Sequence, residues 1–152
     1  MSAYLFDSSA IAKRYCQEVG TDRVESLVAD SANLCLVSRL TVVEMHSVFA
    51  TKVRRQEITQ PDFDLLRHRF LADGKLRLFR VVAISPAIFH QAVLLLRTHA
   101  VTNSLRTLDS LQLAVALQLK QLDRMDHFVT ADKALAEIAA REGLSVIDPA
   151  TN

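Results

Sequence analysis

Residues 4–13 read Tyr4-Leu5-Phe6-Asp7-Ser8-Ser9-Ala10-Ile11-Ala12-Lys13. Three residues of high strand preference precede a carboxylate, two hydroxyls and a helix-compatible run, which is typical of a buried strand that passes into a helix. We therefore expect Asp7 at the carboxyl end of a strand, where open α/β sheets bind their ligands. A helix N-cap explains the same residues, because the side-chain oxygens of Asp and Ser accept orphan backbone N–H groups there.

Strand-like and helix-like segments alternate along the rest of the chain. Runs of strand-forming residues predict further strands over 34–37, 76–84, 127–130 and 144–147. Helical spacing predicts helices over 11–18, 21–28, 38–55 (or from 41), 60–73 (or from 59), 86–99, 107–119 and 132–141. Gly20, Gly74 and Gly143 stand where helices are expected to end.

Alternation of this kind predicts a parallel sheet that is covered by helices on both faces. The expected fold is a three-layer α/β/α sandwich with four to five strands, in which the helices of residues 38–55 and 60–73 form a helical hairpin. A chain of 152 residues has the size of one domain, so we predict a single domain over residues 1–152.

Composition argues against several protein classes. The most apolar stretches do not reach bilayer length, because they are interrupted by Arg80, Pro86, His90 and Arg97. No basic segment precedes an apolar run at the N-terminus, so a signal peptide is not expected. Cys16 and Cys35 are isolated thiols in apolar settings, which indicates a cytoplasmic protein without disulfides or a zinc site. The formal net charge of +1 does not by itself indicate a nucleic-acid partner. A mildly basic surface around a cluster of acidic residues would nevertheless suit a polyanionic substrate.

Glu44 has two interpretations. If its helix begins at Thr41, the pattern Thr41-x-x-Glu44 is a capping box, in which Glu reaches back to a backbone N–H. If the helix begins at Ser38, Glu44 lies inside an apolar stripe between Leu40 and Val48. The second interpretation makes it a candidate for chemistry.

Asp109 and Asp132 complete a set of four acids with Asp7 and Glu44. Asp109 lies at the head of a helix that is apolar nearly all round, where an ionised carboxylate costs several kcal/mol without compensation. Asp132 follows a strand, and either it or Thr130 is a candidate cap of the next helix. The carboxyl ends of parallel strands share one edge, so caps also gather there; only convergence on one point distinguishes chemistry.

Four carboxylates without His or Cys favour a hard cation, Mg²⁺ or Mn²⁺, over zinc. Like charges in one pocket repel each other and raise their proton affinity unless a cation is bound. A site of this kind suits metal-assisted hydrolysis of a phosphodiester.

At these residues the sequence resembles the PIN domain family, and specifically the VapC toxins of toxin–antitoxin pairs. The resemblance covers nearly the whole chain and is carried by residues 4–15, the helix that contains Glu44, residues 105–114 and residues 128–135. It implies that Asp7, Glu44, Asp109 and Asp132 form a Mg²⁺ site, with Asp7 and Asp109 as direct ligands. It also implies that Ser9 and Thr130 orient the acids or a water. Gln112 departs from the pattern, since related sequences often have His there, and we expect altered hydrogen bonding without loss of activity.

The resemblance further implies an endoribonuclease that cleaves structured RNA, such as tRNA or rRNA, and slows translation. It implies a small VapB-like antitoxin whose tail covers the helical hairpin and blocks the site, and a homodimer. The apolar surface of residues 58–70 is a candidate place for either partner, although its apolar positions at helical spacing first indicate a core stripe. Cations at a groove rim are sufficient to bind phosphates, and the candidates are Lys13, Arg14, Lys52, Arg54, Arg55 and Arg106.

Three alternatives stay open at this point. A catalytically silent PIN-fold module would bind RNA or a protein, but it would have no reason to keep four mutually repelling acids. A flap-type DNA nuclease would need an arch or clamp, for which the chain offers no insertion. A phosphatase-like α/β enzyme would have a second Asp two residues after Asp7, where this chain has Ser9.

Overall fold

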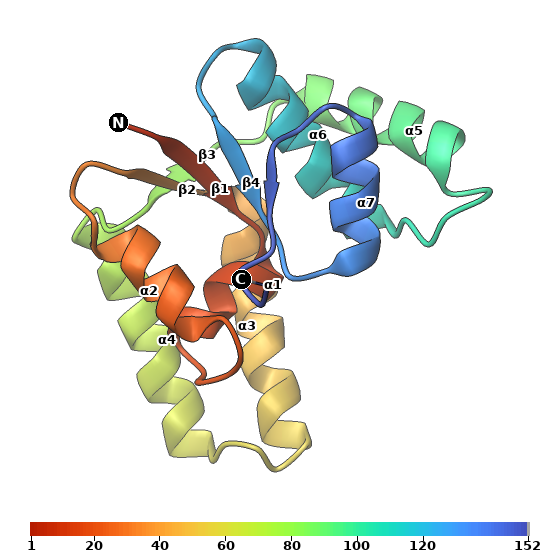
Figure 1. Cartoon of the computed structure of the whole chain (residues 1–152). Helices are drawn as coiled ribbons and strands as arrows, with labels where there is room; N and C mark the ends of the chain where they lie inside the picture. Colours follow the sequence, from red (N-terminus) through yellow and green to blue (C-terminus); the bar gives the residue numbers. More distant parts are fainter. Residues whose placement is uncertain (152) are drawn as a thin grey trace.

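The structure, a computed structural model, describes residues 1–151, so the predicted domain of residues 1–152 ends one residue outside them. Strands and helices alternate along the chain (Figure 1). The elements are β1 (Ala3–Phe6), α1 (Ser8–Ile11), the 3₁₀ helix η1 (Ala12–Arg14), α2 (Thr21–Ala29), β2 (Leu34–Ser38), α3 (Arg39–Arg54), α4 (Gln60–Lys75), β3 (Arg80–Val82), α5 (Pro86–His99), α6 (Thr107–Gln121), β4 (His127–Val129), α7 (Lys133–Arg141) and β5 (Val146–Ile147).

The sheet has five strands in the order β3-β2-β1-β4-β5, and all neighbouring strands are parallel. β1 is central. Leu5 lies level with Leu36 of β2 on one side and with Phe128 of β4 on the other. Because successive residues of a strand point to opposite faces, these three side chains face one layer of helices and Phe6 faces the other.

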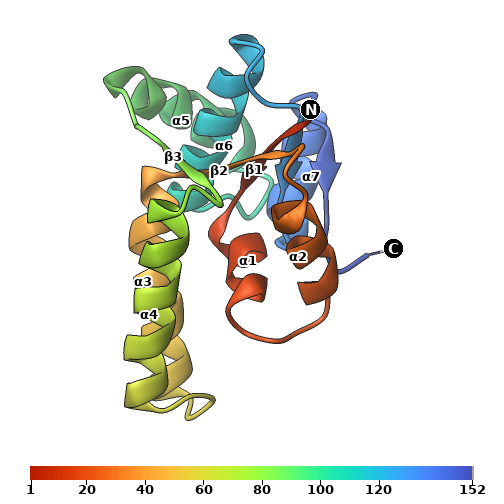
Figure 2. The ribbon, with the colours of Figure 1, turned by 90° about the vertical axis from the view of Figure 1, so that its left-hand side faces the viewer.

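Helices cover both faces of the sheet (Figure 2). Leu5 packs into a core with α5, α6 and α7, whereas Phe6 packs into a second core with α1, α2, α3 and α4. The chain thus forms the predicted three-layer α/β/α sandwich with a parallel sheet. No helix within residues 1–151 combines the length and the apolar character needed to span a membrane.

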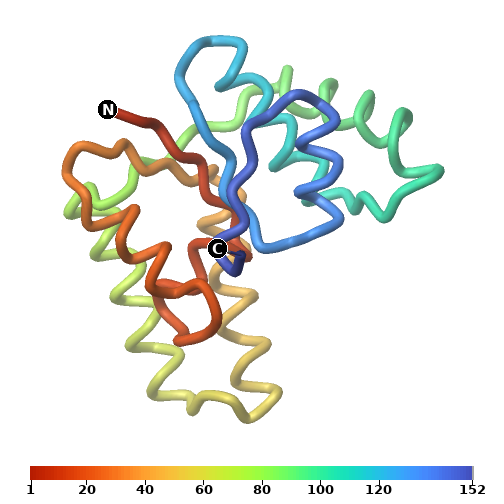
Figure 3. The backbone as a smooth tube through the Cα atoms, in the orientation of Figure 1, coloured from red at the N-terminus to blue at the C-terminus, as the bar shows by residue number. Residues whose placement is uncertain are grey.

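The predicted helical hairpin is present as α3 and α4, and its tip points away from the sheet (Figure 3). Thr59 and Asp62 form a capping box at the start of α4, with a proline in the first turn. Phe70 is buried in the second core, and Phe63 and Leu66 are partly buried against it. The prediction that the apolar positions at helical spacing within residues 58–70 form a core stripe is therefore confirmed.

The helix predicted to continue over residues 11–18 ends earlier than expected, because α1 passes into η1, whose last residue is Arg14 and whose C-cap is Tyr15. The carbonyl of Ala12 accepts from the N–H groups of Tyr15 and Cys16, and the Thr21 hydroxyl donates to the carbonyl of Lys13. These bonds satisfy carbonyl groups that another helical turn would have used. The side chain of Tyr15 is then buried between α3 and α4, where it meets Phe49 and Phe70 edge-on.

Gly20 does not end a helix; it is the residue before α2, with a φ of +93°. A Cβ at this position would lie 2.6 Å from the carbonyl oxygen of Pro149. The close approach of the C-terminal segment, together with the left-handed backbone, explains why glycine stands here. Gly143 does follow α7 as predicted, with a φ of +82°.

The predicted strand over residues 76–84 is reduced to three residues, Arg80–Val82. α4 continues past Gly74 to Lys75, and Leu76 caps it. Arg77 then adopts a φ of +62°, which turns the chain before it can extend.

Candidate active site

The four predicted acids come from four elements that meet at the carboxyl edge of the sheet. Asp7 follows β1, Asp132 lies two residues after Thr130 at the end of β4, and Glu44 and Asp109 lie on α3 and α6. Because β1 lies between β2 and β4 and runs parallel to both, the start of α3 and the start of α7 flank the end of β1. This edge is where ligands of open α/β sheets bind.

Asp7 is buried, with 4% of its surface exposed, and both oxygens of its carboxylate accept hydrogen bonds. Oδ1 accepts from the Ser9 hydroxyl at 2.7 Å and from the backbone N–H of Ala10 at 2.9 Å. Oδ2 accepts from the Thr130 hydroxyl at 2.7 Å. Asp7 is therefore the N-cap of α1, as one reading of the sequence predicted, and a carboxylate held in one orientation by Ser9 and Thr130.

Burial raises the pKa of Asp7 from its ordinary 3.8 to about 6, even though the bonds from Thr130, Ser9 and Ala10 act to lower it. The neighbouring carboxylate of Glu44 raises it further. Desolvation thus outweighs three hydrogen bonds, which is the condition of a carboxylate that lacks a positive partner.

Glu44 is not part of a capping box, because Ser38 is the N-cap of α3 and accepts from the N–H of Thr41. Its Oε1 accepts from the side-chain amide of Gln112 at 2.7 Å, and its Oε2 accepts from the Ser8 hydroxyl at 3.2 Å. Burial raises the pKa of Glu44, and the carboxylate of Asp109 adds to the rise. The interpretation that the helix begins near Ser38, with Glu44 inside an apolar stripe, is therefore confirmed.

Asp109 lies in the first turn of α6 and is 18% exposed. Its Oδ2 lies 3.4 Å from Nε of Arg106, which is the one ion pair of this carboxylate within residues 1–151. Burial raises the pKa of Asp109, and the carboxylate of Asp132 raises it further, while Arg106 lowers it. Arg106 therefore compensates only part of the cost of burying the Asp109 carboxylate, since the pKa of Asp109 stays raised.

Asp132 is the N-cap of α7, where its Oδ1 accepts from the N–H of Leu135 at 3.0 Å. Its own N–H donates to the hydroxyl of Thr130, which also contacts Ser9. Thr130 is therefore not a cap; it joins Asp7 to the start of α7.

The four carboxylates influence one another in sequence: Glu44 acts on Asp7, Asp109 on Glu44, and Asp132 on Asp109. Within residues 1–151, however, no three His, Cys, Asp or Glu side chains stand close enough together to form a metal-binding group. The donor set is nevertheless all hard oxygen, desolvated and short of positive charge, which is the chemistry that fits Mg²⁺ or Mn²⁺. The residues therefore fit the cation in the chemical type of their donor atoms.

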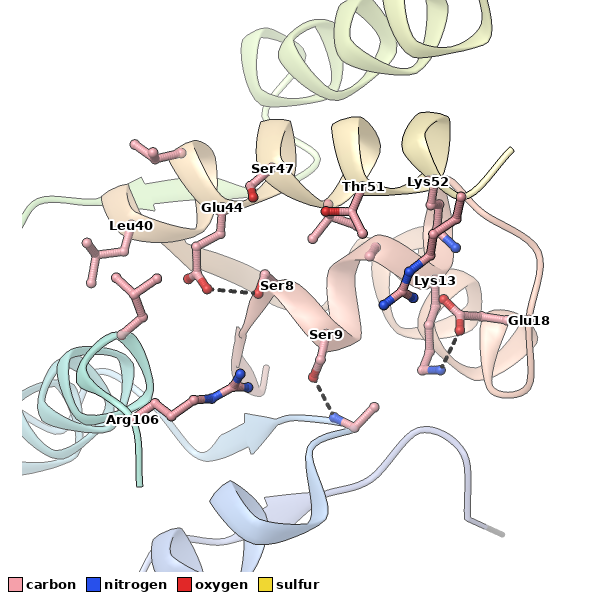
Figure 4. A pocket seen from close by; sticks show the side chains of 16 residues that line it. Ser8, Ser9, Lys13, Glu18, Leu40, Glu44, Ser47, Thr51, Lys52 and Arg106 are labelled. Carbon is pink, nitrogen blue, oxygen red and sulfur yellow. Dashed lines mark hydrogen bonds and ion pairs between the residues drawn. The ribbon is translucent and has the colours of Figure 1, made fainter. Parts of the chain in front are cut away.

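A cleft of about 810 Å³ opens beside these acids, between α1, α3 and the start of α6 (Figure 4). Glu44, Ser8 and Ser9 line it, and Leu40, Val43 and Leu108 contribute apolar side chains to its lining. Lys13, Lys52, Arg55 and Arg106 line the rest of it. Of the four site acids only Glu44 lines the cleft, and it does so together with these four cations.

Four of the six cations that we considered for RNA contact line this cleft, and two do not. Arg14 is 11% exposed and pairs with Asp73 at 3.1 Å and with Glu25. It therefore holds the fold together and is not available to phosphates, which corrects the sequence-based proposal. Arg54 is exposed outside the cleft lining and donates to the Thr51 hydroxyl at 2.9 Å.

Sequence reasoning missed the roles of Ser8 and Gln112. Ser8 follows Asp7 directly, and nothing local indicates that its hydroxyl turns to Glu44, 36 residues away. Gln112 stood out only as a departure from a pattern, whereas the structure shows its amide bonded to Glu44. The one available signal was a polar residue within the apolar run of α6, which in a buried helix requires partners.

Solved structures with the same fold span nearly the whole chain. FitAcB from Neisseria gonorrhoeae is 21% identical with a TM-score of 0.65, covering 96% of this chain and 97% of that one. VapC20 from Mycobacterium tuberculosis, a sarcin–ricin loop cleaving toxin, is 15% identical with a TM-score of 0.63, covering 88% and 93%. A toxin–antitoxin complex from Klebsiella pneumoniae is 22% identical with a TM-score of 0.58, covering 96% and 97%.

These likenesses concern the fold. The sequence matches none of the curated proteins with which it was compared. It does match the family model of the PIN domain over residues 4–141, which is most of the chain. This chain therefore belongs to the PIN domain family.

Proposed function

We propose that this protein is a Mg²⁺-dependent endoribonuclease toxin of the VapC type, which cleaves structured RNA of the tRNA or rRNA class and thereby inhibits translation. The proposal rests above all on one observation: carboxylates from four elements gather at one edge of the sheet, and the pKa values of Asp7, Glu44 and Asp109 are raised there. A fold gains nothing from burying acids that repel each other, so their retention points to a cationic ligand.

In this proposal Asp7, Glu44, Asp109 and Asp132 hold the cation, with Asp7 and Asp109 as its direct ligands. Bound Mg²⁺, or Mn²⁺ in its place, supplies positive charge against the negative charge that develops on the phosphodiester. The protein contributes orientation. Ser9 and Thr130 hold the carboxylate of Asp7 in one rotamer before any ligand arrives, which lowers the cost of assembling the site.

Cations along the cleft would bind the RNA backbone. Lys52, Arg55 and Arg106 line the cleft together with Glu44. Lys13 also lines it, but its ammonium is 2.8 Å from the carbonyl of Val19 and its surface is 6% exposed. Contacts of this kind position a substrate and do not read its bases.

We also propose a VapB-like antitoxin that covers the cleft beside the α3–α4 hairpin, and a homodimer. The antitoxin is supported by the similarity of the fold to a protein of a toxin–antitoxin complex. We further propose a cytoplasmic location, which is supported by the two free cysteines, Cys16 and Cys35.

The test is cleavage of total RNA by the purified protein with Mg²⁺, with a chelator, and by Asp7→Asn in parallel, with the exposed Asp64→Asn as the matched control. We expect cleavage that requires the metal, is lost in Asp7→Asn and is retained in Asp64→Asn. A folded wild-type protein that neither cleaves RNA nor binds Mg²⁺ would contradict the proposal and favour the catalytically silent binding module. Cleavage that persists in the chelator would contradict the metal dependence.

A further inference from the structure

Gln112 is a buried polar side chain beside the proposed site, with 2% of its surface exposed. It lies on α6 between apolar neighbours, one helical turn after Asp109. Its amide nitrogen contacts Thr41 Oγ1 and Glu44 Oε1, both at 2.7 Å. Its amide oxygen accepts from the Ser38 hydroxyl at 2.8 Å.

The direction of each bond follows from the chemistry of the groups. An ionised carboxylate only accepts hydrogen bonds, so the amide nitrogen of Gln112 must face Glu44. The Ser38 hydroxyl donates its hydrogen bond to the amide oxygen of Gln112 and accepts one from the backbone N–H of Thr41. The Thr41 hydroxyl accepts from Gln112 and lies 3.3 Å from Ser38, to which it can donate. The amide group therefore cannot flip without breaking this ring and turning its oxygen toward Glu44.

We infer that Gln112 is a positioning residue that sets the orientation of the Glu44 carboxylate, an inference that rests on the proposed function. It fixes Oε1 from the side of α6. Ser8 holds Oε2 from the side of α1, as Figure 4 shows. The amide is anchored by Ser38, the cap of α3, and by Thr41 in the first turn of the same helix. The helix that carries Glu44 and the helix that orients it are thereby joined.

A neutral donor suits this position. A lysine or arginine would pair with Glu44 and compete with a cation for its charge, whereas an amide orients the carboxylate and leaves its charge available. Hydrogen-bond partners of ligands typically affect metal affinity or activity by about 10- to 100-fold when they are lost. The same range is expected here.

The experiment compares Gln112→Met with wild type in Mg²⁺ and Mn²⁺ binding by titration calorimetry, in the absence of RNA. Met keeps the volume and removes all three hydrogen bonds. Gln118→Met is the matched control, because it makes the same change at a half-buried position of the same helix. We expect the Kd for the metal to rise about 10-fold or more in Gln112→Met and to stay unchanged in Gln118→Met.

Cleavage provides a second readout. With saturating metal, kcat should fall in Gln112→Met while KM for RNA stays constant, because Gln112 does not line the cleft. Gln112→His, which restores an N–H donor, should recover most of the metal affinity at pH 8. If Gln112→Met does not fold, Gln112→Leu replaces it, and circular dichroism establishes which variant is folded.

An unchanged metal Kd in a folded apolar variant would overturn the inference. Glu44→Gln separates this failure from failure of the proposed function. If Glu44→Gln loses metal binding while Gln112→Met keeps it, only the positioning role is wrong. If Glu44→Gln also keeps wild-type binding, the assignment of Glu44 to the proposed site is wrong as well.

Discussion

Thr130 donates a hydrogen bond of 2.7 Å to Oδ2 of Asp7, and the two residues are 123 positions apart in the sequence. The same hydroxyl accepts from the N–H of Asp132 at 3.1 Å. One side chain at the end of β4 thus holds an acid at the end of β1 and the start of the helix that Asp132 caps. The Asp7 carboxylate is oriented before a ligand binds, and its charge is left without a positive partner.

The raised pKa of Asp7 predicts how the stability of the metal-free protein depends on pH. The folded state retains the proton up to about pH 6, whereas the unfolded chain releases it near its ordinary 3.8. The folded state thus binds more protons between these values, so the free energy of unfolding should fall as the pH rises through them. The loss attributable to Asp7 is about 3 kcal/mol by the size of the shift.

Urea unfolding of the wild type and of Asp7→Asn at pH 4 and pH 7 measures this dependence. The Asn variant should lose less stability than the wild type over that range, and Mg²⁺ should stabilise the wild type more than the variant at pH 7. Equal slopes with pH for the two proteins would show that Asp7 ionises normally in the folded state.

Arg55 and Arg54 are adjacent in sequence but differ in their relation to the cleft, since only Arg55 lines it. We expect Arg55→Ala to weaken binding of RNA by a catalytically inactive variant and to reduce the slope of log affinity against log salt by about 1. Arg54→Ala should change neither. Fluorescence anisotropy at several salt concentrations is the measurement, and equal effects of the two substitutions would contradict a backbone contact specific to the cleft.

Asp73 joins α4 to η1, because its Oδ2 accepts from the Tyr15 hydroxyl at 2.8 Å and from Nε of Arg14 at 3.1 Å. Asp73→Ala would leave the buried Tyr15 hydroxyl without its acceptor and Arg14 with only Glu25 as an ionic partner, so we expect a loss of about 2 kcal/mol in the free energy of unfolding. The control is Arg67→Met, which removes an exposed pair with Asp64 at 3.9 Å and should cost less than about 1 kcal/mol. Comparable losses in chemical denaturation would show that the burial of the Asp73 cluster does not matter.

Gly20 is the glycine whose replacement should be most costly. Gly20→Ala combines a left-handed φ of +93° with a Cβ placed 2.6 Å from the carbonyl oxygen of Pro149. We expect a loss of more than about 1 kcal/mol and greater protease sensitivity of the C-terminal segment. Gly74→Ala serves for comparison, because its φ is ordinary and its Cβ meets only the ring of Phe79 at 3.3 Å; a larger loss there would reverse the argument.

Local patterns determined most of the secondary structure. The apolar runs that became β1 and β2 and the caps Asp7 and Asp132 were candidates in the sequence, and Ser38 and Thr59, which cap α3 and α4, were possible first residues of those helices. These features depend on residues within about one helical turn, so one chain is enough to predict them. The four acids were recognisable for the same reason, as each stands at a strand end or in the first turns of a helix.

Contacts between distant residues were decided by the tertiary structure. Arg14 pairs with Asp73, which lies 59 positions away in the sequence. Gln112 donates to Glu44, which lies 68 positions away. The helix predicted to reach Glu18 ends at Arg14. Tyr15, its C-cap, packs edge-on against Phe49 of α3 and Phe70 of α4. Burial and pairing across the chain contribute more free energy than local preference, and a single sequence does not state which distant groups will meet.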